Sequence, residues 1–248
     1  MQIRKNKIKF HIIIQARFNS NRLKGKILKK INNNEILLIM IKRLKKFKDN
    51  IIINISEKNS NELIKFCKKN KINFFVGSDK NVLKRYYDCA NFYNSKIIIR
   101  IPSDCPLIDP KIIEKGLKIF FSGKYSYVSN LCPATYMDGN DVEIFNLKTL
   151  KIIYKKAKSN FDKEHVTTFL RKNLKKFNFK NFEDNKDLSR SYRYTLDYKE
   201  DFELIKQTVS KLGFFVTYKN IYQYLKNNKK ISNLNKKYIG TMWYQKNL

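Results

Sequence analysis

The chain is poor in the residues that build metal clusters and disulfide frameworks. It has two histidines and four cysteines among 248 residues, and no two cysteines form a CxxC pair. A structural zinc site is therefore not expected, and scattered cysteines are typical of a reducing compartment. Glycine and proline are also few, at seven and four residues, and no stretch rich in them divides the chain. We therefore expect one domain over residues 1–248.

Long apolar runs are absent as well. The basic segment 1–9 is followed only by the apolar run Phe10–Ile14 before polar residues return. Such a run is too short for a membrane span or for the apolar part of a signal peptide. The sequence therefore predicts a soluble, cytoplasmic protein with no membrane partner.

Acidic residues are outnumbered, with 21 Asp and Glu against 53 Lys and Arg, which makes the net charge +32. An excess of this size favours a nucleic-acid partner as one hypothesis. The lysines, however, are spread along the chain among many Asn and Ile residues, as an AT-rich coding sequence would produce, and form no arm or block. We interpret the charge as mainly compositional, and keep a nucleic-acid-binding module as a less favoured alternative.

Strand and helix patterns alternate over the first half of the chain. The predicted strands are 9–15, 50–56, 73–76 and 96–101, and the predicted helices are 35–47, 60–69, 81–93 and 110–121. Ser60 and Asp109 stand where helix caps are expected. This alternation predicts an α/β fold, a three-layer sandwich around a mostly parallel sheet.

The pattern is less regular after residue 121. The predicted strands there are 125–130, 142–145, 177–182 and 191–197, and the predicted helices are 147–157, 162–173, 199–212 and 218–227. The lysine-rich end, residues 228–248, is either a tail or an arm that packs on a partner through Tyr238, Trp243 and Tyr244.

The first predicted strand ends in a loop that carries Arg17, Arg22 and Lys26 around Gly25. In open α/β sheets, ligands bind at the carboxyl ends of the strands. The loop matches neither the Walker A pattern nor GxGxxG, but cations and exposed backbone N–H groups can cradle a polyphosphate in the same way. The alternative is a solvated basic loop, which a lysine-rich chain produces easily.

Two aspartates follow predicted strands at the same edge of the sheet. Asp104 lies between Pro102 and Pro106 after the strand 96–101, and Asp197 ends the strand 191–197. Carboxylates in these places could bind Mg²⁺ and bridge it to phosphate oxygens. The alternatives are a turn aspartate that accepts backbone N–H bonds for Asp104, and a helix cap for Asp197.

Further acidic residues cluster around Gly139. Asp138, Asp141 and Glu143 could hold sugar hydroxyls, an amine or a metal, whereas Asp-Gly is also a strong signal for a hairpin turn. His165 is one of the two histidines, and a structural role is open to it as well as a functional one. His11 lies within the first strand and is expected in the core.

Taken together and in order, these segments resemble the SpsF-type cytidylyltransferases, which are related to the acylneuraminate and 3-deoxy-manno-octulosonate cytidylyltransferases. Seven motifs over about residues 10–215 carry the resemblance. They are Ile14-Gln15-Ala16-Arg17 with Ser20, Arg22-Leu23 and Gly25-Lys26, then Gly77-Ser78 with 82–87, 100–110, 127–130, 138–145, 164–167 and 195–204. Lys24 departs from the family pattern, which has proline there, and a looser loop is expected.

The resemblance implies a nucleotide-diphospho-sugar transferase fold of the GT-A-like kind and transfer of CMP from CTP to an acidic sugar, with pyrophosphate released. It implies a nucleotide-binding half over 1–124 and a sugar-binding and dimerisation half over 125–215, hence a homodimer. A nucleotide-sugar-dependent glycosyltransferase is the alternative, but Asp104-Cys105-Pro106 lacks its Asp-x-Asp spacing.

The resemblance also implies roles for individual residues. Arg17, Lys26, Asp104 and Asp197 would be catalytic, and the two aspartates would bind Mg²⁺. The sugar would contact Asp138, Asp141, Glu143 and His165. The nucleotide would contact Gln15, Ala16, Arg17, Ser20, Arg22, Gly25, Lys26, Gly77, Ser78 and Arg100.

Overall fold

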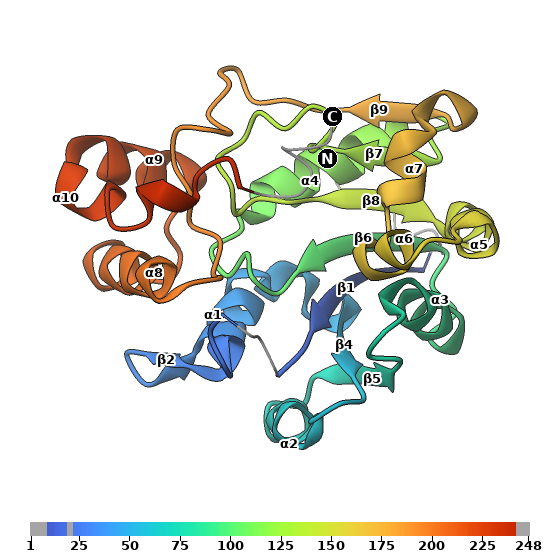
Figure 1. Ribbon diagram of the computed structural model, residues 1–248, viewed down its shortest axis with the longest axis horizontal. Helices are drawn as coiled ribbons and strands as arrows, with labels where there is room; N and C mark the ends of the chain where they lie inside the picture. Colours follow the sequence, from blue (N-terminus) through green and yellow to red (C-terminus); the bar gives the residue numbers. More distant parts are fainter. Residues whose placement is uncertain (1–8, 19–21, 242–248) are drawn as a thin grey trace.

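The computed structural model describes residues 9–18 and 22–241, and its centre is a seven-stranded sheet of order β5-β4-β1-β6-β8-β7-β9 (Figure 1). The strands are β1 Phe10–Ala16, β4 Ile51–Ser56, β5 Asn73–Gly77, β6 Ile97–Pro102, β7 Tyr127–Ser129, β8 Glu143–Asn146 and β9 Phe179–Asn181. The strands β5, β4, β1 and β6 are parallel, β8 is antiparallel to β6 and β7, and β9 is parallel to β7. The predicted mostly parallel α/β sheet is confirmed. A separate hairpin joins β2 Lys30–Ile31 and β3 Asn34–Glu35.

The central strands of the sheet are rich in isoleucine and are buried on both faces. Ile12, Ile13 and Ile14 in β1 are fully buried, and they pair with equally buried isoleucines in β4 and β6. A strand covered on both faces needs no polar alternation, and β-branched residues suit it. This explains why short apolar runs, rather than alternating patterns, marked these strands in the sequence.

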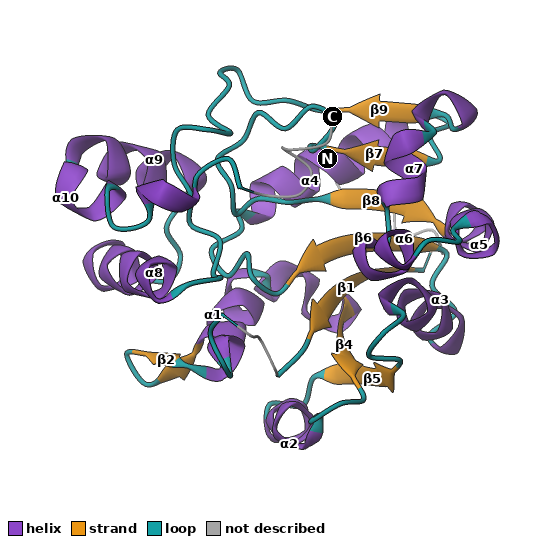
Figure 2. Ribbon diagram, viewed as in Figure 1, coloured by secondary structure: helices purple, strands orange, loops and turns teal. Residues whose placement is uncertain are grey.

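Helices cover both faces of the sheet (Figure 2). Their bounds are α1 Ile36–Arg43, α2 Asn61–Lys69, α3 Val82–Phe92, α4 Pro110–Ser122, α5 Leu147–Lys156, α6 Asn160–His165, α7 Thr168–Lys172, α8 Lys199–Leu212, α9 Tyr218–Asn227 and α10 Lys229–Ser232. One core cluster joins the sheet to α1, α2 and α4, and another joins it to α3, α5 and α7. A third lies beneath α8 and α9 at one end of the molecule. Among the described residues, no helix has the length and apolar character needed to cross a bilayer.

The predicted strand 191–197 is wrong. Only an isolated bridge joins Arg193 to Asp138, and the backbone N–H groups of Tyr194 and Leu196 donate to the carbonyls of Asp138 and Asp104. The segment is extended because it is tied to two loops, which local sequence patterns do not report.

Two predicted helical features also need correction. The predicted helix 162–173 is two helices, α6 and α7, because Val166 adopts a φ of 61° and ends the first. Ser60 precedes α2 as expected, but its side chain makes no capping hydrogen bond. Asp138-Gly139, for which a hairpin turn was the alternative to a functional role, lies in the long loop between the antiparallel strands β7 and β8.

Residues 228–241 are not an extended tail. They form α10 and a short 3-10 turn at Lys236–Tyr238, and Ile231 and Leu234 pack on the cluster beneath α8 and α9. Tyr238 therefore contacts its own chain, whereas Trp243 and Tyr244 lie outside the described residues.

Asp109 caps one helix and anchors a second, and its predicted capping role is confirmed. Its Oδ1 accepts from the N–H of Lys111 in α4, and its Oδ2 accepts from the N–H of Tyr218 in α9. We expect Asp109→Ala to lower the free energy of unfolding in urea by about 2–3 kcal/mol, because two partly buried backbone N–H groups lose a partner. Asn146→Ala, which removes the single cap bond of α5, should cost about 1 kcal/mol. Equal losses in the two variants would contradict the double role.

Candidate active site

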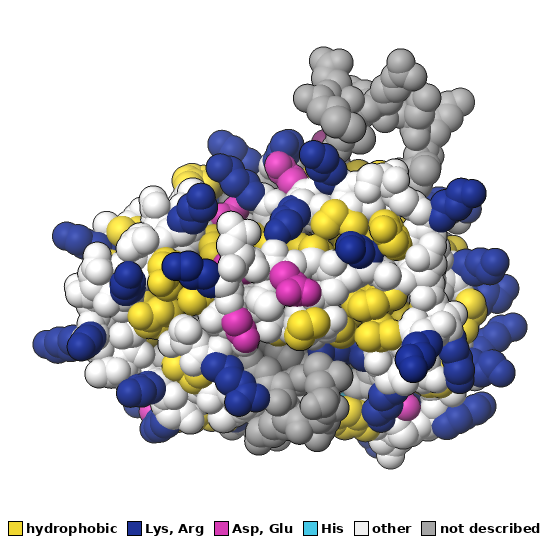
Figure 3. Space-filling view, turned by 90° about the horizontal axis from the view of Figure 1, so that it is seen from above, with side chains coloured by type: hydrophobic (Ala, Val, Ile, Leu, Met, Phe, Trp, Pro, Cys, Tyr) yellow, Lys and Arg dark blue, Asp and Glu magenta, His cyan; other side chains and the backbone are white. Residues whose placement is uncertain are grey.

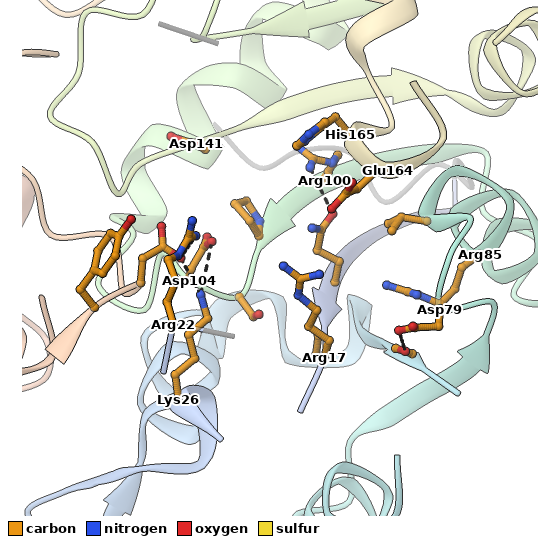
Figure 4. Close-up of a pocket in the computed structure, with 18 of the residues that line it drawn as sticks. Arg17, Arg22, Lys26, Asp79, Arg85, Arg100, Asp104, Asp141, Glu164 and His165 are labelled. Carbon is orange, nitrogen blue, oxygen red and sulfur yellow. Dashed lines mark hydrogen bonds and ion pairs between the residues drawn. The ribbon is translucent and has the colours of Figure 1, made fainter. Parts of the chain in front are cut away.

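A cavity of about 620 Å³ opens at the carboxyl ends of β1, β4 and β6 (Figure 4). This is the edge at which open α/β sheets bind ligands. Residues from both halves of the chain line it. They are Gln15, Ala16, Arg17, Arg22, Lys26, Ser56, Asp79, Val82, Arg85, Arg100, Pro102, Ser103, Asp104, Leu131, Asp141, Glu164, His165, Asp197, Tyr198 and Thr241.

The loop after β1 brings Lys26 into the cavity wall. Gly25 has a φ of 63°, a conformation that suits glycine, and its N–H donates to the carbonyl of Phe18. Lys26 follows in a 3-10 turn and is almost fully buried. Its Nζ donates to the carbonyl of Leu196 at 2.7 Å and to Oδ1 of Asp197 at 2.9 Å. Gly25 itself does not line the cavity, so it shapes the loop without facing it.

The other residues of this loop differ in exposure. Arg17 is exposed and points into the cavity, and Arg22 has a half-exposed side chain whose Nη2 lies 2.8 Å from Oδ1 of Asp197. Lys24, at the position where the family pattern has proline, is exposed at the surface. Ser20 lies outside the described residues.

Asp104 and Asp197 lie on either side of Lys26, as Figure 4 shows for Asp104. Lys26 Nζ is 3.8 Å from Oδ2 of Asp104, so one ammonium group serves both carboxylates. Although burial works against ionisation, Lys26 and Arg22 hold the pKa of Asp197 well below its ordinary value. Burial raises the pKa of Asp104, with Lys26 opposing the shift and the charge of Asp197 adding to it. The two aspartates therefore differ in pKa in the free protein, since the pKa of Asp197 is lowered and that of Asp104 is raised.

A buried arginine that the sequence analysis missed organises this region. Arg193 is 1% exposed and binds Asp138 at 2.7 Å, Asp197 at 2.9 Å and Asp201 at 3.2 Å. Asp138 also accepts a hydrogen bond from Thr195 and does not line the cavity. The structure thus places the carboxylate of Asp138 against Arg193 in the interior, and the expected contact of Asp138 with the sugar stays a prediction. The sequence offered one signal for this role, because Arg193 is followed within eight positions by the acidic residues Asp197, Glu200 and Asp201.

Glu143 likewise lies behind the cavity wall rather than in it. It is 1% exposed and accepts hydrogen bonds from Arg100 at 2.6 Å, Tyr127 at 2.5 Å and Thr167 at 3.1 Å. Arg100, which also donates to Oε1 of Gln15, does line the cavity. Glu143 is thus placed to hold Arg100, and its expected contact with the sugar stays a prediction.

Asp141 and His165 line the cavity, as the sequence analysis placed them. The break at Val166 ends α6 and leaves Glu164 and His165 at the cavity wall, near Arg100 (Figure 4). Burial lowers the pKa of His165; the nearby Glu164 opposes this shift, and the charges of Arg100 and Arg17 add to it. A neutral imidazole therefore stands beside the arginine.

The far end of the cavity lies at β4, β5 and α3. Gly77 and Ser78 do not line it, but the carbonyl of Ser78 accepts a hydrogen bond from Arg85, which does. Asp79 lines it as well and accepts from the hydroxyl of Ser56. The sequence analysis therefore identified the loop at Gly77-Ser78, but it did not identify Asp79 and Arg85, whose side chains line the cavity.

A family model for cytidylyltransferases matches residues 11–238 of this chain. The chain belongs to the cytidylyltransferase family. The resemblance to SpsF-type cytidylyltransferases is confirmed by the spore coat polysaccharide biosynthesis protein SpsF of Bacillus subtilis, which is 29% identical over 215 residues, 81% of this chain and 86% of SpsF. An uncharacterized protein of Methanocaldococcus jannaschii is 33% identical over 228 residues, 90% of this chain and 93% of its own length.

Solved structures agree with the assignment of this chain to the cytidylyltransferase family. A cytidylyltransferase of Leptospira borgpetersenii superposes with a TM-score of 0.87 at 34% identity, covering 91% of this chain and 97% of its own. A CMP-2-keto-3-deoxy-manno-octonic acid synthetase, solved in complex with CTP, superposes with a TM-score of 0.64 at 13% identity, covering 82% and 99% of the two chains. At 13% identity, the second likeness shows a shared fold alone.

The central role of Arg193 predicts a large stability effect. We expect Arg193→Met to lower the free energy of unfolding by about 3–5 kcal/mol, because buried carboxylates lose their cation. Lys46→Met, which breaks the exposed pair between Lys46 and Glu114, should cost no more than about 1 kcal/mol. Urea unfolding followed by circular dichroism measures both, and a small loss in Arg193→Met would show that the cluster does not depend on this residue.

The burial of Asp141 predicts that the free energy of unfolding depends on pH. Burial raises its pKa well above the ordinary value, and repulsion from Asp138 and Asp104 adds to the shift. The folded protein therefore retains a proton that the unfolded chain loses above about pH 4, so this residue destabilises the fold as pH rises. The advantage of Asp141→Asn over the wild type in urea unfolding should grow between about pH 5 and pH 8. The exposed Asp49→Asn should show no such trend, and a constant difference for Asp141→Asn would contradict the prediction.

Proposed function

We propose that this cytidylyltransferase transfers CMP from CTP to an acidic sugar and releases pyrophosphate. The observation that carries the proposal is the meeting of Arg17, Arg22 and Lys26 with Asp104 and Asp197 in one cavity. Nucleotidyl transfer needs positioning and charge neutralisation more than covalent chemistry by the protein. Three cations beside two carboxylates suit that requirement, since they can neutralise a triphosphate.

The cavity offers three regions for the three parts of the reaction (Figure 4). The end near Asp79 and Arg85 suits the cytosine base, whose amine and carbonyl need an acceptor and a donor. Arg17 and Lys26 suit the phosphates between the two ends. Arg100, with His165 beside it, suits the carboxylate of an acidic sugar, because a guanidinium group binds carboxylates through paired hydrogen bonds.

Magnesium is the implied cofactor. Among the described residues, no group of three His, Cys, Asp or Glu side chains is arranged to hold a metal ion. Mg²⁺ in nucleotide sites commonly uses one or two carboxylates, with phosphate oxygens and water completing its shell. Asp104 fits this role, because its carboxylate is partly exposed to the cavity. Asp197 is only 4% exposed, and its oxygens pair with Arg22, Lys26 and Arg193, so it would hold the ion by exchanging one of these pairs. When bound, the ion would neutralise phosphate charge.

The residues of the chain supply the rest of the mechanism. A hydroxyl of the sugar attacks the α-phosphorus of CTP in line, and pyrophosphate leaves. Lys26 and Arg17 stabilise the negative charge that develops on the departing pyrophosphate. Arg100, fixed by Glu143, orients the sugar through its carboxylate so that the hydroxyl faces phosphorus.

Pyrophosphate release, measured with inorganic pyrophosphatase and phosphate detection, tests the proposal. Reactions contain CTP, Mg²⁺ and a panel of acidic sugars, with their neutral counterparts and the other nucleoside triphosphates as controls. Turnover that requires CTP, an acidic sugar and Mg²⁺ supports the proposal, and addition of EDTA should abolish it. Turnover with neutral sugars alone, or only with a UDP-sugar and an acceptor, would contradict it.

Two substitutions test the clamp around the triphosphate. We expect Asp104→Asn and Lys26→Ala each to lower kcat for CTP about 10²–10³-fold, the usual cost of losing one electrostatic contact with the transition state. Asp49→Asn, which is exposed and remote in the sequence from both loops, serves as the matched control. Near-normal turnover in either clamp variant would remove that residue from the site.

The proposed reaction depends neither on the positive charge of the surface nor on the predicted homodimer. Figure 3 shows Lys and Arg side chains around the whole visible face, with no single basic patch. A distribution of this kind gives no support to a nucleic-acid groove. The homodimer through residues 125–215 stays a prediction, which analytical ultracentrifugation of the full chain can test.

A further inference from the structure

The last described residues return to the active-site cavity. After α10 and the turn at Lys236–Tyr238, Thr241 becomes part of the cavity lining. Asn235 anchors this return, because it is 1% exposed and its amide donates to the carbonyl of Arg193 at 3.0 Å and to Asp201 at 2.7 Å. The segment is therefore attached to the same buried cluster that holds Asp197.

Tyr238 makes the most extensive contact between this segment and the site. Its ring stacks on that of Tyr198 with centroids 3.6 Å apart and planes 3° from parallel. Its hydroxyl lies 3.3 Å from a carboxylate oxygen of Glu200, and the neighbouring Lys237 pairs with the same oxygen at 2.8 Å. The turn is thus held against the start of α8 by a ring stack, a hydrogen bond and an ion pair.

Tyr198 connects this stack to the triphosphate loop. It lines the cavity directly after Asp197, and the guanidinium carbon of Arg22 lies 5.1 Å from its ring centroid. Arg22 also pairs with Asp197, yet its side chain is 51% exposed. A long exposed side chain loses conformational entropy when it binds a ligand, and an aromatic surface that confines it beforehand reduces that loss.

We propose that Tyr238 is a positioning residue for the nucleotide. It fixes the ring of Tyr198, which in turn confines the guanidinium group of Arg22 beside the cavity. Arg22 then meets the triphosphate already oriented, although Tyr238 itself does not line the cavity. The inference rests on the proposed function, because it takes the triphosphate as the partner of Arg22. It makes the turn at Lys236–Tyr238 a support of the binding site, where the sequence left open a tail or an arm that packs on a partner.

Isothermal titration of CTP, in the presence of MgCl₂ and without sugar, measures this effect directly. We expect Tyr238→Leu to weaken CTP binding about 3- to 10-fold, the usual value of one aromatic or cation–π contact, and to raise KM with little change in kcat. Tyr238→Phe, which keeps the ring, should restore binding to within about twofold. Lys236→Ala is the matched control, since it removes a neighbouring exposed cation and leaves the ring stack, the hydrogen bond and the ion pair.

A double-mutant cycle separates positioning from a merely structural role. In an Arg22→Ala background, Tyr238→Leu should have little further effect on CTP affinity, because the residue it positions is gone. An equal loss in both backgrounds, or unchanged affinity in a folded Tyr238→Leu, overturns the inference while leaving the proposed function intact. Failure of the wild type to bind CTP contradicts the proposed function instead. Calorimetric Tm values check folding, and Tyr238→Met replaces Tyr238→Leu if the latter does not fold.

Discussion

The ion pairs of Arg193 with three carboxylates are the interaction on which the site depends. A buried guanidinium group is tolerated only where carboxylates compensate it, and here they come from the loop before β8, from the segment before α8 and from α8 itself. Since no β-ladder holds residues 191–197, these charges do so instead. Asp197 therefore lies at the cavity because Arg193 fixes one of its oxygens, and Asp201, which the same arginine holds, accepts a hydrogen bond from its backbone N–H.

The same arrangement divides the acidic residues into two groups. Asp138, Glu143 and Asp201 lie in the interior and hold arginines, whereas Asp104, Asp141 and Asp197 line the cavity. Asp197 belongs to both groups, because Arg193 holds its Oδ2 while Arg22 and Lys26 hold its Oδ1. Asp104 and Asp197 thus have cations of the triphosphate loop beside them, which suits a site that must accept a highly charged nucleotide and release charged products.

Local patterns predicted the helices and buried strands well, because isoleucine runs and amphipathic helices report burial by themselves. They failed at 191–197 and at Val166, where tertiary contacts impose the conformation. For the site, the motif order pointed to the edge of the sheet at which the cavity opens and to half of the residues that line it. It could not separate Asp141 from Asp138, because the two lie in one motif and differ only in whether Arg193 reaches them.

The sequence by itself determined the α/β class, the family and the basic loop after β1, because each is written in a contiguous run of residues. Only the tertiary structure decided which carboxylates line the cavity, that Arg193 joins three segments, and that Tyr238 stacks on Tyr198 beside the cavity. These features depend on residues that lie far apart in the chain and meet at one edge of the sheet. Their pairing is decided by burial and charge compensation, which no local spacing encodes.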